Sequence, residues 1–244
     1  MKTPHTSIHA STLGTIKLLH DKKTGTLTYL QHGGYQSAVD RYGISLDTYI
    51  HAIYGLILQT SAKNILMIGC GGGTLGRMLT VAGRKITIVD IDEASFKVAT
   101  HHFGLPDGIA CHVADGLVFM QKTRRHFDAV IIDAFIGEKV PPQFTGDDFC
   151  KAARRCLKPE GAMFINICLQ NKADLTADKL AARLRKNGWK SQLLDQRGGA
   201  RNGIVVAGEV KGLRSPELLL VPDAEAAKVR RELRGTRFRP VISP

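Results

Sequence analysis

The stretch at residues 64–76, where a strand-length apolar run leads into a cluster of glycines, constrains this chain most. The run from Ile65 to Ile68 shows no polar and apolar alternation, which is typical of a strand buried on both faces of a parallel sheet. Glycines let the backbone turn sharply and approach a ligand at the start of a helix. The glycines that follow the run are Gly69, Gly71, Gly72 and Gly73. The pattern predicts a strand, a nucleotide-binding loop and a helix.

A second apolar strand, residues 85–90, ends in Asp90. A carboxylate about twenty residues after the glycine loop is the group that reaches the ribose hydroxyls in nucleotide-binding βαβ units. The spacing Gly71-x-Gly73-x-x-Gly76 also fits the dinucleotide fingerprint. The loop alone therefore leaves open both a nicotinamide enzyme and an S-adenosyl enzyme.

Two later strands also lead to acids. The strand at residues 109–113 is followed by Asp115, and the strand at residues 127–133 ends in Asp133. In a parallel sheet the carboxyl ends of the strands lie along one crevice, which is where ligands bind in open α/β sheets. Together with Asp90, these acids predict a binding site there. The alternative for Asp115 is a structural cap on the helix that follows it.

Alternating strands and helices over residues 45–210 predict an α/β fold, with a Rossmann-like, doubly wound, seven-stranded sheet. Two closing segments, residues 189–194 and 202–208, are expected to form a final hairpin. Such an ending is usual for a domain of the S-adenosylmethionine-dependent methyltransferase type, whereas a nicotinamide-binding half-domain does not need it.

Two flanking regions complete the predicted organisation. Residues 1–44 are expected to be a small N-terminal β-hairpin appendage, with a turn at residues 21–25 and a loose polar start over residues 1–14. Residues 211–244 are expected to be a basic C-terminal tail that packs on the domain only through the apolar run at residues 218–221.

The chain carries a formal net charge of +12, which indicates an anionic partner or surface. The alternative is a set of solvated helix faces, because no aromatic residues interleave with the charges. Its five cysteines lack metal-ligand spacing, so free thiols in a reducing compartment and no metal are expected. No apolar run approaches the roughly 20 residues of a membrane span, and the start lacks the apolar segment of a signal peptide. We expect a cytoplasmic protein that does not enter a membrane.

Several motifs together resemble the spermidine synthases over nearly the whole chain up to Gly208. They are residues 68–74, 89–92, 114–116 and 130–133, preceded by the β appendage and the helix that carries Tyr49. The sequences Gln-Ser-Ala-Val-Asp at residues 36–40 and Asp-Ala-Phe at residues 133–135 are similar to the short, divergent members of that family.

This resemblance implies an S-adenosyl nucleoside as co-substrate, either S-adenosylmethionine or its decarboxylated form. Asp90 would bind the ribose hydroxyls, Asp115 would accept from the adenine amino group, and Asp133 would orient and deprotonate an amine that attacks carbon next to sulfur. The other residues implied in binding the nucleoside are Gln36, Tyr49, Gly69, Gly71, Gly73, Ile91 and Gly116. A small-molecule acceptor and a homodimer are also implied.

The chain departs from the family at Gly72 and Ile136, where spermidine synthases have aspartates. Without these acids we expect a poor spermidine synthase, and the basic surface disfavours a polycationic substrate. Glu138 or Asp40 could compensate from neighbouring loops. Met67 also stands where many small-molecule methyltransferases have an acid.

Three other functions stay open. One is a methyltransferase on the same fold, with an arginine or lysine near the loop that holds the carboxylate of intact S-adenosylmethionine. Another is a non-catalytic protein that binds a nucleoside or nucleic acid. The third is a nicotinamide enzyme.

Overall fold

The computed structural model describes residues 5–31, 34–137, 139–196 and 198–242, and its centre is a mixed sheet. In spatial order its strands are β12 (Arg237–Arg239), β10 (Ser191–Asp195), β11 (Arg201–Gly208), β9 (Leu157–Leu169), β8 (Phe127–Ile132), β5 (Asn64–Ile68), β6 (Lys85–Asp90) and β7 (Ala110–Val113). The strands from β9 to β7 run parallel, whereas β11 is antiparallel to both β9 and β10. The predicted α/β fold and its closing hairpin are confirmed, but β12 makes the sheet eight-stranded rather than seven-stranded.

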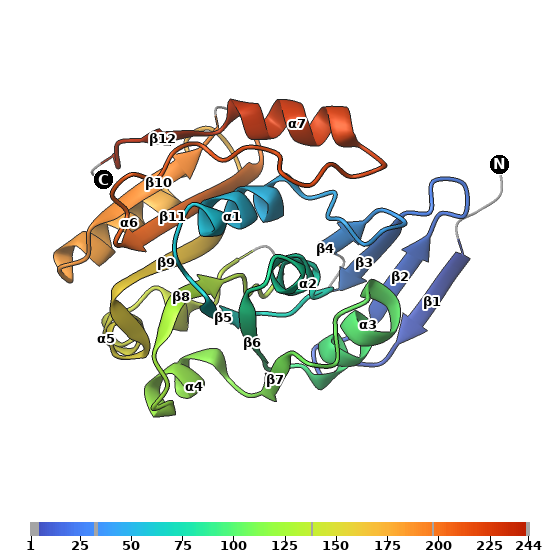
Figure 1. Ribbon diagram of the computed structural model, residues 1–244, viewed down its shortest axis with the longest axis horizontal. Helices are drawn as coiled ribbons and strands as arrows, with labels where there is room; N and C mark the ends of the chain where they lie inside the picture. Colours follow the sequence, from blue (N-terminus) through green and yellow to red (C-terminus); the bar gives the residue numbers. More distant parts are fainter. Residues whose placement is uncertain (1–4, 32–33, 138, 197, 243–244) are drawn as a thin grey trace.

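Helices cover both faces of this sheet (Figure 1). One face packs against α1 (Thr48–Leu58), α2 (Thr74–Val81) and α3 (Glu93–Phe103). The other packs against α4 (Gly116–Lys122), α5 (Asp147–Cys156) and α6 (Thr176–Lys186). Along β5, Ile65 and Met67 belong to the first core, and Leu66 and Ile68 belong to the second. Both faces of the strand are therefore buried, which explains the unbroken apolar run.

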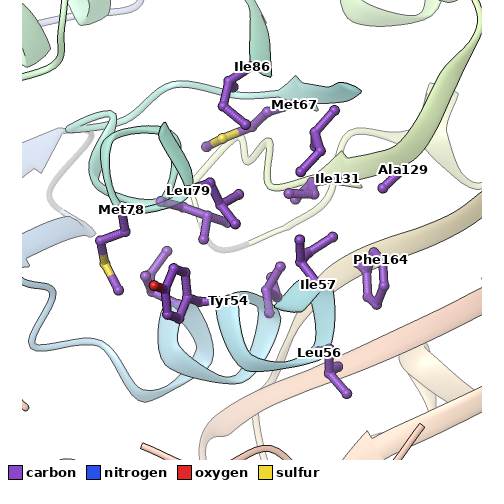
Figure 2. Packing of buried hydrophobic residues seen from close by; sticks show 14 of the residues in the cluster. Tyr54, Leu56, Ile57, Met67, Met78, Leu79, Ile86, Ala129, Ile131 and Phe164 are labelled. Carbon is purple, nitrogen blue, oxygen red and sulfur yellow. The ribbon is translucent and has the colours of Figure 1, made fainter. Parts of the chain in front are cut away.

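Figure 2 shows the first core at the point where α1 and α2 meet the sheet. Tyr54 and Ile57 of α1 lie with Leu79 of α2 against Met67 and Ile131 of the central strands. This packing places the N-terminal ends of both helices beside the carboxyl ends of the strands.

The N-terminal region is a second, four-stranded antiparallel sheet of β1 (His5–His9), β2 (Ile16–His20), β3 (Leu27–Gln31) and β4 (Gly34–Val39). The predicted hairpin is confirmed as β2 and β3. The expectation of a loose start is wrong for residues 5–9, because β1 pairs with β2 along its whole length, from His5 opposite His20 to His9 opposite Ile16. Residues 1–4, which it also covered, lie outside the described part of the chain. This small sheet packs on α3 through a cluster that includes Tyr29 and Phe103.

The C-terminal segment is part of the domain, so the expectation that it packs only through residues 218–221 is wrong. Its helix α7 (Ala226–Gly235) buries Val229 and Leu233, and it packs against α1. Strand β12 then joins the main sheet beside β10. In Figure 1 the segment, coloured red, lies along the α1 and β10 side of the molecule.

Three further observations concern the described residues. None of their helices combines the length and the apolar character that a bilayer crossing requires. No cluster of three or more His, Cys, Asp or Glu side chains in the described part could hold a metal ion. No disulfide joins the five cysteines, all of which are described.

Candidate functional site

Backbone hydrogen bonds align the carboxyl ends of the central strands. The N–H of Gly69 donates to the carbonyl oxygen of Val89 at 2.9 Å, and that of Ala114 donates to Asp90 at 2.9 Å. The N–H of Asp133 donates to the carbonyl oxygen of Ile68 at 2.8 Å. The segments that follow β5, β6, β7 and β8 therefore meet at one edge of the sheet.

A cavity of about 160 Å³, called here the crevice cavity, lies at this edge. The predicted residues that line it are Gln36, Tyr49, Gly69, Gly71, Asp90, Ile91, Asp115, Gly116 and Asp133. Gly73 does not line it. Instead Gly73 begins α2 with a φ of 66°, and its α-carbon faces Leu105 and Ala99.

Two of the strand-end acids already accept backbone hydrogen bonds. Asp90 accepts from the N–H of Cys70 at 2.6 Å and from that of Asp92 at 2.8 Å, and burial raises its pKa. Asp115 accepts from the N–H of Val118 at 2.9 Å, so it caps α4 as well as lining the cavity. Each carboxylate oxygen has a further lone pair, so these bonds leave capacity for a ligand.

Asp133 is held by two side chains from distant parts of the chain. The Tyr49 hydroxyl of α1 donates to Oδ2 at 3.4 Å, and the Asn166 amide of β9 donates to Oδ1 at 2.9 Å. Asn202 of β11 in turn donates to the Asn166 oxygen at 2.9 Å, which fixes the orientation of that amide. Burial raises the pKa of Asp133 to about 6, although the hydrogen bonds from Asn166 and Tyr49 oppose the shift.

Gly69 allows the Asp133 backbone to come this close. Its φ is +96°, a conformation that side-chain-bearing residues rarely adopt, and a Cβ there would lie 2.2 Å from the Asp133 carbonyl oxygen. The first loop glycine is therefore required by the neighbouring strand as well as by the turn.

A second cavity, of about 350 Å³, adjoins the crevice cavity and is called here the side cavity. The two share Gln36, Tyr49 and Phe135 as lining residues. Its walls come from β4, the start of α1, the strands β9 and β11, and helix α7. Asn166, which holds Asp133, also lines it.

The side cavity contains two carboxylates. Asp47 precedes α1 and accepts from the N–H of Ala38 at 3.2 Å and from the Tyr35 hydroxyl. Burial raises the pKa of Asp47 to about 6, and the nearby charge of Asp133 adds to the shift. Glu232 of α7 accepts from the Thr48 hydroxyl at 2.6 Å.

The two cations that line the side cavity have other partners. Arg201 pairs with the buried Asp195 at 2.7 Å. The Lys228 side chain is half-exposed, and its ammonium lies 3.6 Å from the Glu225 carboxylate. Its charge lowers the pKa of Asp47, but by less than burial raises it. The side cavity is therefore lined by two acids, one cation that is paired with a buried acid, and one half-exposed cation.

The departures from the family pattern have structural explanations. A Cβ at Gly72 would lie 2.9 Å from the Phe103 ring, so Phe103 occupies the space of a side chain there. Ile136 is exposed and lines the crevice cavity.

Asp40 is not a compensating acid, because it accepts from three backbone N–H groups, two in its own turn and one from Asp223, and lines neither cavity. Glu138 lies outside the described residues.

Sequence reasoning missed Asn166, Asn202, Asp47 and Glu232. Asn166 had a signal, since it is the one polar residue between Ala162 and Ile167 in an apolar strand. The others carried none, because their role depends on elements that meet only in the folded chain.

This chain is similar in sequence to several known proteins. Residues 65–161 match a family model described as a methyltransferase domain. A polyamine aminopropyltransferase of Chromobacterium violaceum is 31% identical over 125 residues, which cover 49% of this chain and 48% of that protein. An N-terminal histidine N-methyltransferase of Emericella nidulans is 29% identical over 122 residues, 48% of this chain and 22% of that protein. The matches thus span between a fifth and a half of these relatives.

A solved structure extends the likeness to the whole fold. A probable spermidine synthase from Corynebacterium glutamicum superimposes with a TM-score of 0.78 at 17% identity, and covers 98% of this chain and 92% of its own. The expected fold, with a domain of the methyltransferase type, is confirmed.

Proposed function

We propose that this chain, which is spermidine-synthase-like and has a methyltransferase-type domain, transfers an aminopropyl-type alkyl group from an S-adenosyl sulfur nucleoside to an amine. The observation that carries the proposal is the position of Asp133, a raised-pKa carboxylate between the crevice cavity and the side cavity. The nucleoside would occupy the crevice cavity, with its ribose at Asp90 and its adenine near Asp115. The amine would enter from the side cavity.

In the proposed reaction the amine lone pair attacks the carbon bonded to the sulfonium. The carbon–sulfur bond breaks, its electron pair stays on sulfur as a thioether, and the proton lost by the amine goes to Asp133. Asp133 is suited to this step because a base works best when its pKa lies near the working pH. Tyr49 and Asn166 would hold the carboxylate in one orientation throughout.

The two acids of the side cavity, Asp47 and Glu232, support an amine acceptor. The expectation that the basic surface disfavours a cationic substrate considered only the net charge. An acceptor is instead governed by the charges that face it at short range. In this cavity they are Asp47, Glu232 and Lys228, since the fourth charged residue, Arg201, is paired with a buried acid. These acids occupy positions other than Gly72 and Ile136, so the loss of acids there does not leave the amine without a partner.

We expect Asp47→Asn and Glu232→Gln each to raise the KM for the amine by roughly 10-fold or more, because each removes a charge-assisted contact. The kcat should change less than the KM. Glu225→Gln is the matched control, since Glu225 is an exposed glutamate near the start of the same helix and does not line the side cavity. Steady-state kinetics with varied amine measure both constants. An unchanged KM in both variants would place the amine elsewhere.

The whole proposal is tested by incubating the protein with S-adenosylmethionine or its decarboxylated form and a panel of monoamines and diamines. Mass spectrometry then identifies the modified amine and the released nucleoside. Release of methylthioadenosine together with an alkylated amine supports the proposal. The proposal would be contradicted if no amine of the panel reacted with either donor.

The same assay separates the alternatives. Methyl transfer, favoured by the matched domain model, releases S-adenosylhomocysteine instead. A non-catalytic homologue would bind the nucleoside and release nothing. A nicotinamide enzyme would be recognised by a separate measurement, the rise of its thermal midpoint in the presence of NAD. The homodimer, the cytoplasmic location and the anionic partner stay predictions.

A further inference from the structure

The N-terminus of α2 lies open beside the crevice cavity. Its N-cap, Gly73, provides no side-chain cap, and the first turn contains no acidic residue. The backbone N–H groups of Thr74 and Leu75, which both line the cavity, donate to no residue in the described part of the chain. Such a terminus carries partial positive charge and free donors, and it attracts an anion.

Thr74 gives a second, independent indication of a ligand. Its side chain lines the crevice cavity and is only 4% exposed. Its hydroxyl has no hydrogen-bond partner among the described residues. A buried hydroxyl without a partner costs stability, and such groups in folded proteins call for an explanation such as a ligand.

The side chains of the glycine loop itself are neutral, although Asp90 of β6 accepts from the Cys70 N–H of this loop at 2.6 Å. Ser37 of β4 accepts from the N–H of Gly72 at 3.1 Å, and it lines the cavity next to Gln36. The acids that line the crevice cavity, Asp90, Asp115 and Asp133, all follow other strands. The glycine loop itself has no acid, and the Phe103 ring fills the space that a side chain at Gly72 would need.

An arginine or lysine near the glycine loop was the group expected to hold the carboxylate of intact S-adenosylmethionine, and this expectation is not met. None of the described residues lining the crevice cavity is a lysine or an arginine. Arg77, the basic residue of α2, instead donates to the Gly43 carbonyl oxygen at 2.7 Å. An anion at this end of the crevice cavity would therefore be held by the helix terminus and the Thr74 hydroxyl, and not by a cationic side chain.

Resting on the proposed function, we infer that the donor keeps its α-carboxylate and is intact S-adenosylmethionine. The carboxylate accepts hydrogen bonds from the N–H groups of Thr74 and Leu75 and from the Thr74 hydroxyl. A decarboxylated donor would instead place a bare ammonium near the positive end of α2, where no loop acid offsets it. The aminopropyl-type group of the proposed function would then keep the carboxylate and be transferred as an amino-carboxypropyl group.

Calorimetry with three thioethers tests the inference without turnover. S-adenosylhomocysteine has the full amino-acid tail, its decarboxylated analogue lacks only the carboxylate, and methylthioadenosine has neither tail group. We expect S-adenosylhomocysteine to bind roughly 10-fold to 100-fold more tightly than the decarboxylated analogue, because it alone makes the charge-assisted hydrogen bonds.

Variants of one residue locate the effect. Thr74→Val removes the hydroxyl and keeps the shape, so it should weaken S-adenosylhomocysteine roughly 5-fold to 10-fold and leave methylthioadenosine unchanged. Thr74→Ser should restore most of the affinity. Thr80→Val on the same helix is the matched control, because the Thr80 hydroxyl bonds the Gly76 carbonyl oxygen at 2.9 Å and does not line the cavity.

The outcomes separate this inference from the proposed function. Equal or tighter binding of the decarboxylated analogue overturns the inference and leaves the proposed function standing. Equal losses for S-adenosylhomocysteine and methylthioadenosine in Thr74→Val also overturn it, because the hydroxyl would then serve the nucleoside or the fold. If none of the three thioethers binds, both proposals fail.

Discussion

Asp133→Asn should lower the rate of alkyl transfer by roughly 10²-fold to 10⁴-fold, the usual contribution of a general base. The amide keeps the shape of the side chain and its contacts with Tyr49 and Asn166, yet it cannot take a proton from the amine. Nucleoside affinity should change little. Asp148→Asn is the matched control, since Asp148 is an exposed aspartate on α5 that contacts Lys151. A variant that keeps wild-type turnover would exclude Asp133 as the base.

The pH profile should report the same group. Because burial raises the pKa of Asp133 to about 6, the carboxylate is ionised above that pH and protonated below it. The kcat of the wild-type protein at saturating amine should therefore fall as the pH drops through about 6. This constant is the one to follow, because Asp47 also has a pKa raised to about 6 and acts mainly on the KM. In Asp133→Asn this limb should disappear from the residual rate.

The raised pKa of Asp133 also predicts an effect on stability. Its folded pKa lies above the unfolded value, so the folded state binds the proton more tightly and loses stability as the pH rises from about 4 to about 6. Asp133→Asn should consequently raise the thermal midpoint more at pH 8 than at pH 4. Scanning calorimetry at the two pH values measures the difference.

Arg239→Met should lower the free energy of unfolding by about 3 to 5 kcal/mol, the usual cost of breaking a buried ion pair. The Arg239 guanidinium bonds Asp178 at 2.7 Å and Asp195 at 3.0 Å. The two carboxylate side chains are 0% and 3% exposed, so the variant would leave Asp178 without its cation and Asp195 with Arg201 alone. Denaturant unfolding measures the loss.

The matched control for this prediction is Arg237→Met on the same strand, because the Arg237 side chain donates only to backbone carbonyl oxygens of Arg234 and Thr236. The loss should also depend on pH. Hydrogen bonds from Arg239 hold the pKa of Asp178 below its usual range, and hydrogen bonds from Arg201 and Arg239 do the same for Asp195, despite the opposing effect of burial. The stabilisation is therefore present at neutral pH and fades as the pH falls through those lowered values. Equal unfolding free energies for Arg239→Met and Arg237→Met would show that β12 does not depend on this pair.

The sequence determined the main sheet and the line of acids along its edge. The apolar run at residues 64–68, the glycines after it and the alternation of strands with helices are local patterns, and the short-range geometry of the backbone links each to one kind of element. Parallel strands then place Asp90, Asp115 and Asp133 at one edge without any knowledge of side-chain contacts. Gln36 and Tyr49 were placed through the resemblance to a family.

Tertiary structure alone decided what surrounds Asp133 and what faces it. Asn166 contacts Asp133, and Asn202 contacts Asn166, because β9 lies between β8 and β11. Glu232 reaches Thr48 across 184 residues of chain because α7 packs on α1. The packing of the C-terminal segment on the domain depends on Arg239, whose partners Asp178 and Asp195 lie on other elements. Contacts of this kind bring together residues that share no local period, so the burial and pairing of charges are set only when the chain has folded.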